Sequence, residues 1–135
     1  MTSSTLASKA VTDTVGLVLR IEHRKSGQKA RAHFEAAETG NTTIYIPTMV
    51  FAEILYLSEK RRIQISLGEV EEYLMRYPNY KEYPMSFSVI QKASEITDIP
   101  ELHDRLIAAT ARLLNLELIT NDPVIAGSTF VRTIW

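Results

Sequence analysis

Short runs of β-forming residues alternate with stretches of helical periodicity, and this alternation limits the possible folds more than any other feature of the chain. Strands that alternate with helices are joined by crossover connections, which build a mainly parallel sheet with helices on both faces. The pattern therefore predicts an α/β protein with three layers, α/β/α, around a small sheet of about four or five strands. The predicted strands are residues 10–12, 44–46, 80–85, 117–120 and 130–134, and the predicted helices are residues 17–21, 28–38, 48–60, 67–76, 87–96 and 101–114, with a short helical turn from residue 123.

The length of 135 residues suits one domain, and the sequence contains no internal repeat, low-complexity tract or linker rich in proline, glycine or serine. We expect residues 1–8 to form a flexible polar leader and residues 9–135 to form the single domain.

Composition excludes several classes of protein. The chain has no cysteine, which excludes disulfides, thiol nucleophiles and cysteine-ligated zinc, and which suits the cytoplasm, where we expect the protein. No apolar run approaches the ~18 residues that a membrane span needs. The 16 acidic and 15 basic residues nearly cancel, so a polyanion would have to be bound locally. The sequence also lacks the glycine-rich phosphate loops and the G-x-S-x-G motif.

Four acidic residues stand where a parallel sheet places its ligands, beyond the carboxyl ends of the strands. Asp13 follows the first predicted strand and Asp122 follows the strand at 117–120. Asp104 lies in the first turn of helix 101–114, and Glu53 lies about two helical turns beyond the strand at 44–46. The aspartates have structural alternatives: Asp13 and Asp122 would cap helices, and Asp104 would favour the positive end of its helix.

Glu53 fits a structural role less well. Its neighbours three and four residues away on the helix are all apolar, namely Met49, Val50, Tyr56 and Leu57. A carboxylate on such a face needs a partner or a metal ion to offset its desolvation. Carboxylates that converge repel one another unless a cation neutralises them, and oxygen ligands suit Mg²⁺ or Mn²⁺. The residues thus predict a metal-dependent hydrolase of phosphate esters.

At these residues the chain resembles the PIN-domain family and, within it, the VapC-type ribonuclease toxins of prokaryotic toxin–antitoxin pairs. The similarity runs in order along nearly the whole chain. Its matching stretches are Val11-Thr12-Asp13-Thr14, Phe51-Ala52-Glu53-Ile54, the run from Asp104 to Ala111, Leu118-Ile119-Thr120-Asn121-Asp122 and Thr133-Ile134-Trp135.

The resemblance implies a parallel sheet between helices and cleavage of RNA that depends on Mg²⁺ or Mn²⁺. It implies that Asp13 and Asp104 are direct metal ligands, and that Glu53 and Asp122 complete the site or hold metal-bound water. Thr120 matches a hydroxyl residue near the site, with strand packing as the alternative. Val15 departs from the family, which often has a small polar residue at this position.

The resemblance also implies partners: an antitoxin that lays an apolar helix in a groove and directs a basic side chain toward the carboxylates, and a second copy of the chain. The region of Tyr56, Leu57, Tyr73 and Leu74 is a possible dimer surface, with core packing as the alternative. Two basic groups are possible RNA contacts, namely Arg20, Arg24, Lys25, Lys29 and Arg31, and residues 60–62. The alternative is a solvated helix face for the first group and a favourable charge at the helix C-terminus for the second.

Two other classes of function remain to be weighed. A PIN domain outside a toxin–antitoxin pair would be an RNA-processing nuclease or a scaffold that binds RNA or protein without cutting, although the intact acidic quartet disfavours a scaffold. A phosphorelay receiver also uses an acidic Mg²⁺ pocket, but it needs tandem acids after the first strand and a lysine late in the chain. The chain has neither, since Lys92 is its last lysine.

Overall fold

The computed structural model describes residues 8–135, which form a five-stranded sheet with helices on both faces. The strands are β1 (Ala10–Thr12), β2 (Ile44–Pro47), β3 (Tyr80–Tyr83), β4 (Glu117–Ile119) and β5 (Thr133–Ile134). The helices are α1 (Thr14–Ile21), α2 (Gln28–Glu38), α3 (Thr48–Glu59), α4 (Leu67–Arg76), α5 (Phe87–Glu95), α6 (Leu102–Leu114) and α7 (Pro123–Ala126). Apart from Ser8, the predicted leader lies outside the described residues.

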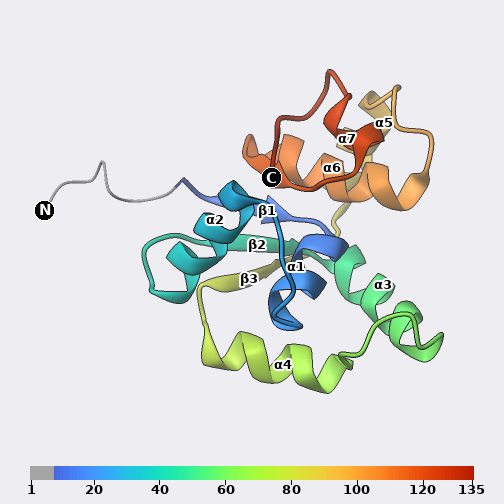
Figure 1. Cartoon of the computed structure of the whole chain (residues 1–135). Helices are drawn as coiled ribbons and strands as arrows, with labels where there is room; N and C mark the ends of the chain where they lie inside the picture. The colour runs from blue at the N-terminus through green and yellow to red at the C-terminus, as the bar shows by residue number, and fades with distance from the viewer. Residues whose placement is uncertain (1–7) are drawn as a thin grey trace, which may run out of the picture.

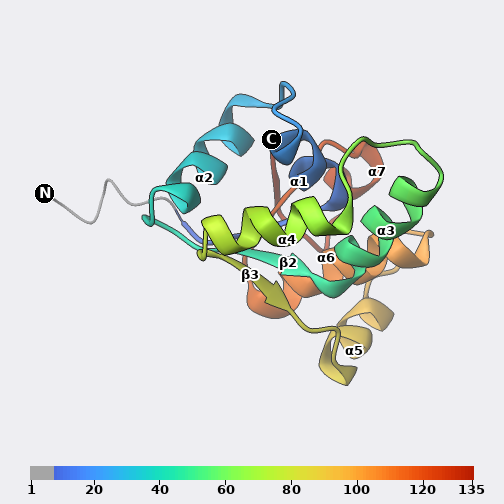
Figure 2. The ribbon, with the colours of Figure 1, turned by 90° about the horizontal axis from the view of Figure 1, so that it is seen from below.

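All neighbouring strands run parallel, in the order β3-β2-β1-β4-β5. Helices α5 and α6 cover one face of the sheet, and α1 and α4 cover the other with α2 beside them (Figures 1 and 2). Helix α3 contacts both α1 and α6 at the sheet edge where the site forms. The predicted three-layer α/β fold is confirmed, and its sheet is parallel throughout.

The core lies on both sides of β1, the central strand, whose three residues are all buried. Leu17 of α1 and Phe34 of α2 pack under the sheet, and Ile107 of α6 packs against the other face. Burial on both faces explains why β1 and β4 each contain two consecutive apolar residues, Ala10-Val11 and Leu118-Ile119, without polar alternation. None of the helices within residues 8–135 is long and apolar enough to cross a membrane.

Two predicted strands are clearly shorter in the structure. The strand predicted at 80–85 stops at Tyr83, because Pro84 has no N–H for the ladder. The strand predicted at 130–134 is only Thr133–Ile134. Asp98 holds the two residues that precede the predicted strand, since its carboxylate accepts bonds from the Ser128 hydroxyl (2.7 Å) and the Thr129 N–H (2.8 Å).

The register of the sheet brings two of the predicted site segments together. Strands β1 and β4 are adjacent and parallel, with Thr12 paired to Ile119. The Asp13 N–H then donates to the Ile119 carbonyl at 3.1 Å. The residues that follow these strands therefore leave the sheet at the same edge, as parallel pairing requires.

Candidate functional site

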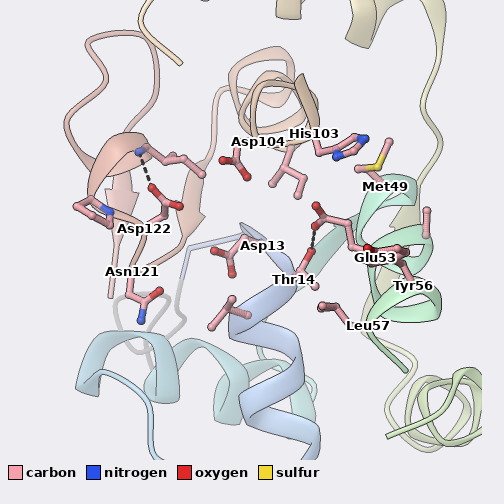
Figure 3. Close-up of a pocket in the computed structure, with 15 residues that line it drawn as sticks. Asp13, Thr14, Met49, Glu53, Tyr56, Leu57, His103, Asp104, Asn121 and Asp122 are labelled. Atoms are coloured by element: carbon pink, nitrogen blue, oxygen red, sulfur yellow. Dashed lines mark hydrogen bonds between the residues drawn. The ribbon is translucent and has the colours of Figure 1, made fainter. Parts of the chain in front are cut away.

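A pocket of about 880 Å³ opens at this edge of the sheet. All four predicted acids line it: Asp13 after β1, Glu53 on α3, Asp104 on α6 and Asp122 before α7. Figure 3 shows the four carboxylates arranged around one space, with Asp13 between Asp122 and Glu53 and with Asp104 across from it. Four segments that are distant in sequence thus contribute one carboxylate each.

Asp13 is the most buried of the four, with 6% of its surface exposed. It is also the N-cap of α1, because its Oδ1 accepts the Gly16 N–H at 2.7 Å. Burial raises the pKa of Asp13 to about 6; hydrogen bonds from Thr120 and Gly16 oppose the rise, and the charges of Glu53 and Asp122 add to it. Capping and a place in the pocket are therefore compatible roles for this residue.

Asp104 and Asp122 reach the pocket from helix starts. The N–H of Asp104 donates to Glu101 at 2.8 Å, since Glu101 is the N-cap of α6. Burial, then the charges of Glu101, Asp122 and Glu53, raise the pKa of Asp104 to about 6. Asp122 caps α7, its Oδ1 accepting the N–H groups of Val124 (2.8 Å) and Ile125 (3.2 Å). The predicted cap at Asp122 is confirmed, and its carboxylate still lines the pocket.

Glu53 is half-buried on α3, and its partner is Thr14, whose hydroxyl donates to Oε1 of Glu53 (Figure 3). Thr14 lies next to Asp13 at the start of α1, so one hydrogen bond links two of the acidic segments. Sequence reasoning named Thr14 within the motif but gave it no role, because its partner lies 39 residues away. Val15 stands at the pocket rim and is 47% exposed.

Thr120 is buried at the end of β4 and ties two acids together. Its hydroxyl hydrogen-bonds to Asp13 and also accepts the N–H of Asp122 at 3.1 Å. Both alternatives for Thr120, the hydroxyl role that the resemblance implies and strand packing, are compatible with these contacts. His103 and Asn121 also line the pocket, and the only sequence signal for either is that it precedes one of the aspartates.

The charges around the pocket are strongly one-sided. Among residues 8–135 the lining holds four carboxylates and no lysine or arginine, with His103 the only other ionisable group apart from Tyr56. The raised pKa values of Asp13 and Asp104 reflect this uncompensated arrangement together with burial. The four carboxylates are oxygen donors of the kind that Mg²⁺ or Mn²⁺ prefers. Within residues 8–135, no group of three or more histidine or acidic side chains is arranged so that it could hold a metal ion.

The other predicted surfaces separate into different environments. None of the basic residues between 20 and 31 lines the pocket, and Arg20 forms an ion pair with Glu38 at 2.9 Å. Tyr73 also donates to Glu38, at 2.6 Å, so this member of the predicted dimer surface belongs to an internal network. Tyr56, in contrast, is 52% exposed at the pocket.

We predict that Gly16→Ala destabilises the fold by about 1–2 kcal/mol, as overpacking does, and lowers at least tenfold the RNA cleavage that the resemblance implies. A Cβ at Gly16 would lie 2.9 Å from Oγ1 of Thr12 and 3.1 Å from Oδ1 of Asp13, which displaces the Asp13 carboxylate. Thermal unfolding and cleavage assays measure the two effects. Gly68→Ala on α4 is the matched control, because its Cβ meets nothing closer than 3.7 Å. The control should keep full cleavage and gain up to about 1 kcal/mol; equal behaviour of the two variants would contradict the prediction.

Together, the parallel sheet and the pocket at its carboxyl edge define an α/β protein in which four carboxylates gather beyond the ends of the strands. The PIN-domain family model matches residues 11–127, and the chain belongs to the PIN-domain family. No curated protein sequence matches the chain significantly.

Solved structures share this fold at low sequence identity. VapBC2 from Rickettsia felis, bound to a DNA fragment from its promoter, is similar with a TM-score of 0.72 and 21% identity over 94% of this chain and 98% of that one. A toxin–antitoxin complex from Klebsiella pneumoniae is similar with a TM-score of 0.62 and 20% identity over 93% of this chain and 96% of that one. VapC20 from Mycobacterium tuberculosis, a toxin that cleaves the sarcin–ricin loop, is similar with a TM-score of 0.61 and 16% identity over 91% of this chain and 98% of that one.

Proposed function

We propose that the protein is a metal-dependent endoribonuclease that acts as the toxin of a toxin–antitoxin pair in the cytoplasm. The observation that carries the proposal is the pocket with four carboxylates and no lysine or arginine among the described residues that line it. Membership of the PIN-domain family and the likeness to toxin structures support it.

In this proposal Asp13 and Asp104 hold Mg²⁺ or Mn²⁺, and Glu53 and Asp122 complete the site. A bound divalent ion supplies a positioned water and offsets the charge of the phosphodiester during in-line displacement. The chain's own contribution is orientation: Thr14 holds Glu53, Gly16 and Thr120 hold Asp13, and α7 holds Asp122 through its first N–H groups.

An antitoxin and a second copy of the chain are the proposed protein partners. The pocket has apolar walls beside its acids, including Met49, Leu57 and Ile107. This combination suits a partner segment with apolar side chains and one basic side chain, in the manner of a helix in a groove. The alternative is a PIN protein outside such a pair, either an RNA-processing nuclease or a scaffold that does not cut.

Removal of metal tests the proposal. The full chain should cleave single-stranded RNA in Mg²⁺ or Mn²⁺, lose that activity in EDTA, and regain it when either ion is added in excess. Gel analysis of end-labelled RNA provides the readout. Cleavage that persists in EDTA would contradict the metal-dependent mechanism, and RNA binding without cleavage in either ion would favour the scaffold.

A further inference from the structure

Helix α3 leads from the acidic pocket to an exposed basic end. Tyr56 follows Glu53 by three residues and Lys60, the C-cap of α3, follows Tyr56 by four, so the three residues lie along one face of the helix. Glu53 and Tyr56 line the pocket, and Figure 3 shows them on the same stretch of α3. The face therefore continues outward from the carboxylates.

Tyr56 offers an aromatic surface at the rim of the pocket. Its side chain is largely exposed, and Nζ of Lys60 lies 5.7 Å from the centroid of its ring. Proteins that bind single-stranded nucleic acids use an exposed aromatic ring next to a cation. A base stacks on the ring, and a phosphate pairs with the cation. At about 880 Å³ the pocket is much larger than a metal ion requires, which leaves room for part of a nucleotide.

Three cations follow one another at the end of this face, namely Lys60, Arg61 and Arg62. All three are exposed, and none forms an ion pair within the part of the chain that the structure describes, although Glu59 precedes them. Arg20 and Arg24, by contrast, pair with Glu38 and Glu22. The charges at the end of α3 thus remain available to a polyanion.

The backbone places Arg61 where helices usually have glycine. Arg61 has a φ of 56°, its N–H bonds to the Ser58 carbonyl at 3.0 Å, and the Arg62 N–H bonds to the Leu57 carbonyl at 2.9 Å. This closing turn favours glycine, because a side chain strains the left-handed conformation. His23 closes α1 with a similar φ of 57°, so it provides a matched position for mutation.

We propose that α3 carries a subsite for an unpaired stretch of RNA, in which a base stacks on Tyr56 and the phosphates contact Lys60, Arg61 and Arg62. The subsite rests on the proposed function and extends it to substrate binding. At this end of α3 an RNA strand fits better than the antitoxin segment proposed for the pocket, because the three cations would repel the basic side chain that the carboxylates attract. The RNA phosphates would pair with the three cations, and a metal ion bound at the carboxylates would offset the repulsion between those carboxylates and the phosphates.

Equilibrium binding to an inactive protein tests the subsite separately from cleavage. The Asp104→Asn protein in EDTA is titrated against a fluorescein-labelled 12-nucleotide RNA of randomised sequence, with fluorescence anisotropy as the readout. Adding Tyr56→Ala should weaken binding about tenfold. Tyr56→Phe should keep the affinity within about twofold, since the ring is retained. A double-stranded RNA of the same length should bind independently of Tyr56.

The salt dependence of binding tests the cations. Lys60→Gln/Arg61→Gln/Arg62→Gln should reduce the slope of log affinity against log salt by about 2, from roughly 0.7 for each lost contact. Lys25→Gln/Lys29→Gln/Arg31→Gln removes the same charge from the other basic group and should leave the slope unchanged. An equal effect of the two triple variants would overturn a localised subsite.

Substitution by glycine separates the Arg61 side chain from its backbone. Arg61→Gly and His23→Gly both relieve a left-handed residue, so neither should lower the Tm. Only Arg61→Gly should weaken RNA binding, by about two- to threefold. Equal RNA affinity of these two variants would contradict a role for Arg61.

The remaining outcomes distinguish the subsite from the enzyme. Unchanged RNA binding by Tyr56→Ala would overturn the subsite. A change in the oligomeric state of Tyr56→Ala relative to the wild type, measured by size-exclusion chromatography, would also overturn it, because Tyr56 would then belong to a dimer interface. Failure of the Asp104→Asn protein to bind RNA would also overturn it. Binding that depends on Tyr56, with no cleavage by the wild type in Mg²⁺ or Mn²⁺, would uphold the subsite and reject the proposed nuclease.

Discussion

Asp13→Asn and Asp104→Asn should each reduce RNA cleavage at least about 100-fold while the protein remains folded, since even supporting residues of metal sites contribute 10- to 100-fold. Each substitution removes a negative charge from the pocket with little change in shape. The N-cap of α1 survives Asp13→Asn, because an asparagine oxygen can still accept the Gly16 N–H. Cleavage rates of the purified variants, with circular dichroism to establish folding, measure the effect.

Glu101→Gln is the charge-matched control for Asp104→Asn. Glu101 contributes to the raised pKa of Asp104 but does not line the pocket. Its glutamine can still accept the Asp104 N–H, so α6 keeps its cap. The control should cleave RNA within about threefold of the wild type. Full activity in both aspartate variants would reject the site.

The metal-free protein should lose stability as the pH rises from 5 to 7. Burial, with the nearby Glu53 and Asp122 charges, raises the pKa of Asp13 from 3.8 to about 6. Between these values the folded state binds more protons than the unfolded state, so the free energy of unfolding falls with rising pH. The full penalty is about 3 kcal/mol above pH 6, of which about 1 kcal/mol develops between pH 5 and 7. Asp104 acts in the same direction but is more exposed, so its contribution is smaller.

Asp13→Asn isolates this effect from the other titrating groups. The variant should be more stable than the metal-free wild type at pH 7, by about 1–3 kcal/mol, and its advantage should shrink toward pH 5. Groups with lowered pKa values titrate below this window, among them Asp98, which accepts bonds from Thr129 and Ser128. Urea unfolding of both proteins at pH 5, 6 and 7 in EDTA measures the difference. If the free energies of unfolding of the two proteins changed in parallel with pH, the raised pKa of Asp13 would be contradicted.

Excess Mg²⁺ gives the same comparison a second readout. An ion that binds the folded state stabilises it by mass action, so Mg²⁺ at pH 7 should raise the Tm of the wild type. Asp13→Asn should show a much smaller rise, because it lacks one proposed ligand. A similar rise in both proteins would indicate that Mg²⁺ binds elsewhere.

The convergence of the acids on one pocket was predictable because strand ends are visible in the sequence. Asp13 and Asp122 each follow an apolar run, and parallel pairing of β1 and β4 brings them to one edge. Glu53 was identifiable from the apolar residues around it on α3, which make an unpartnered carboxylate unfavourable. The fold followed from the same alternation of strands and helices, and most elements begin and end within one residue of their predicted limits.

The rest depends on contacts that no local pattern reveals. The hydroxyl of Thr14 donates to Glu53, which is 39 residues away in the sequence. The hydroxyls of Tyr73 and Tyr80 donate to Glu38, which is 35 and 42 residues away from them. Arg20 was grouped with its basic neighbours in the sequence, but the packing of α1 against α2 gives it an acidic partner. The last strand is shorter than predicted because the backbone of Phe130 bonds to side chains instead, its N–H to the Ser128 hydroxyl and its carbonyl to Arg112.

The most direct measurement is the mapping of RNA ends after incubation with the wild type or with Asp104→Asn, in Mg²⁺ and in EDTA. The proposed nuclease should produce discrete new ends in the wild-type sample with Mg²⁺, and those ends should be absent from the EDTA sample and from the Asp104→Asn sample. The same ends in all samples would contradict the account, because cleavage would then require neither the acidic pocket nor a metal ion.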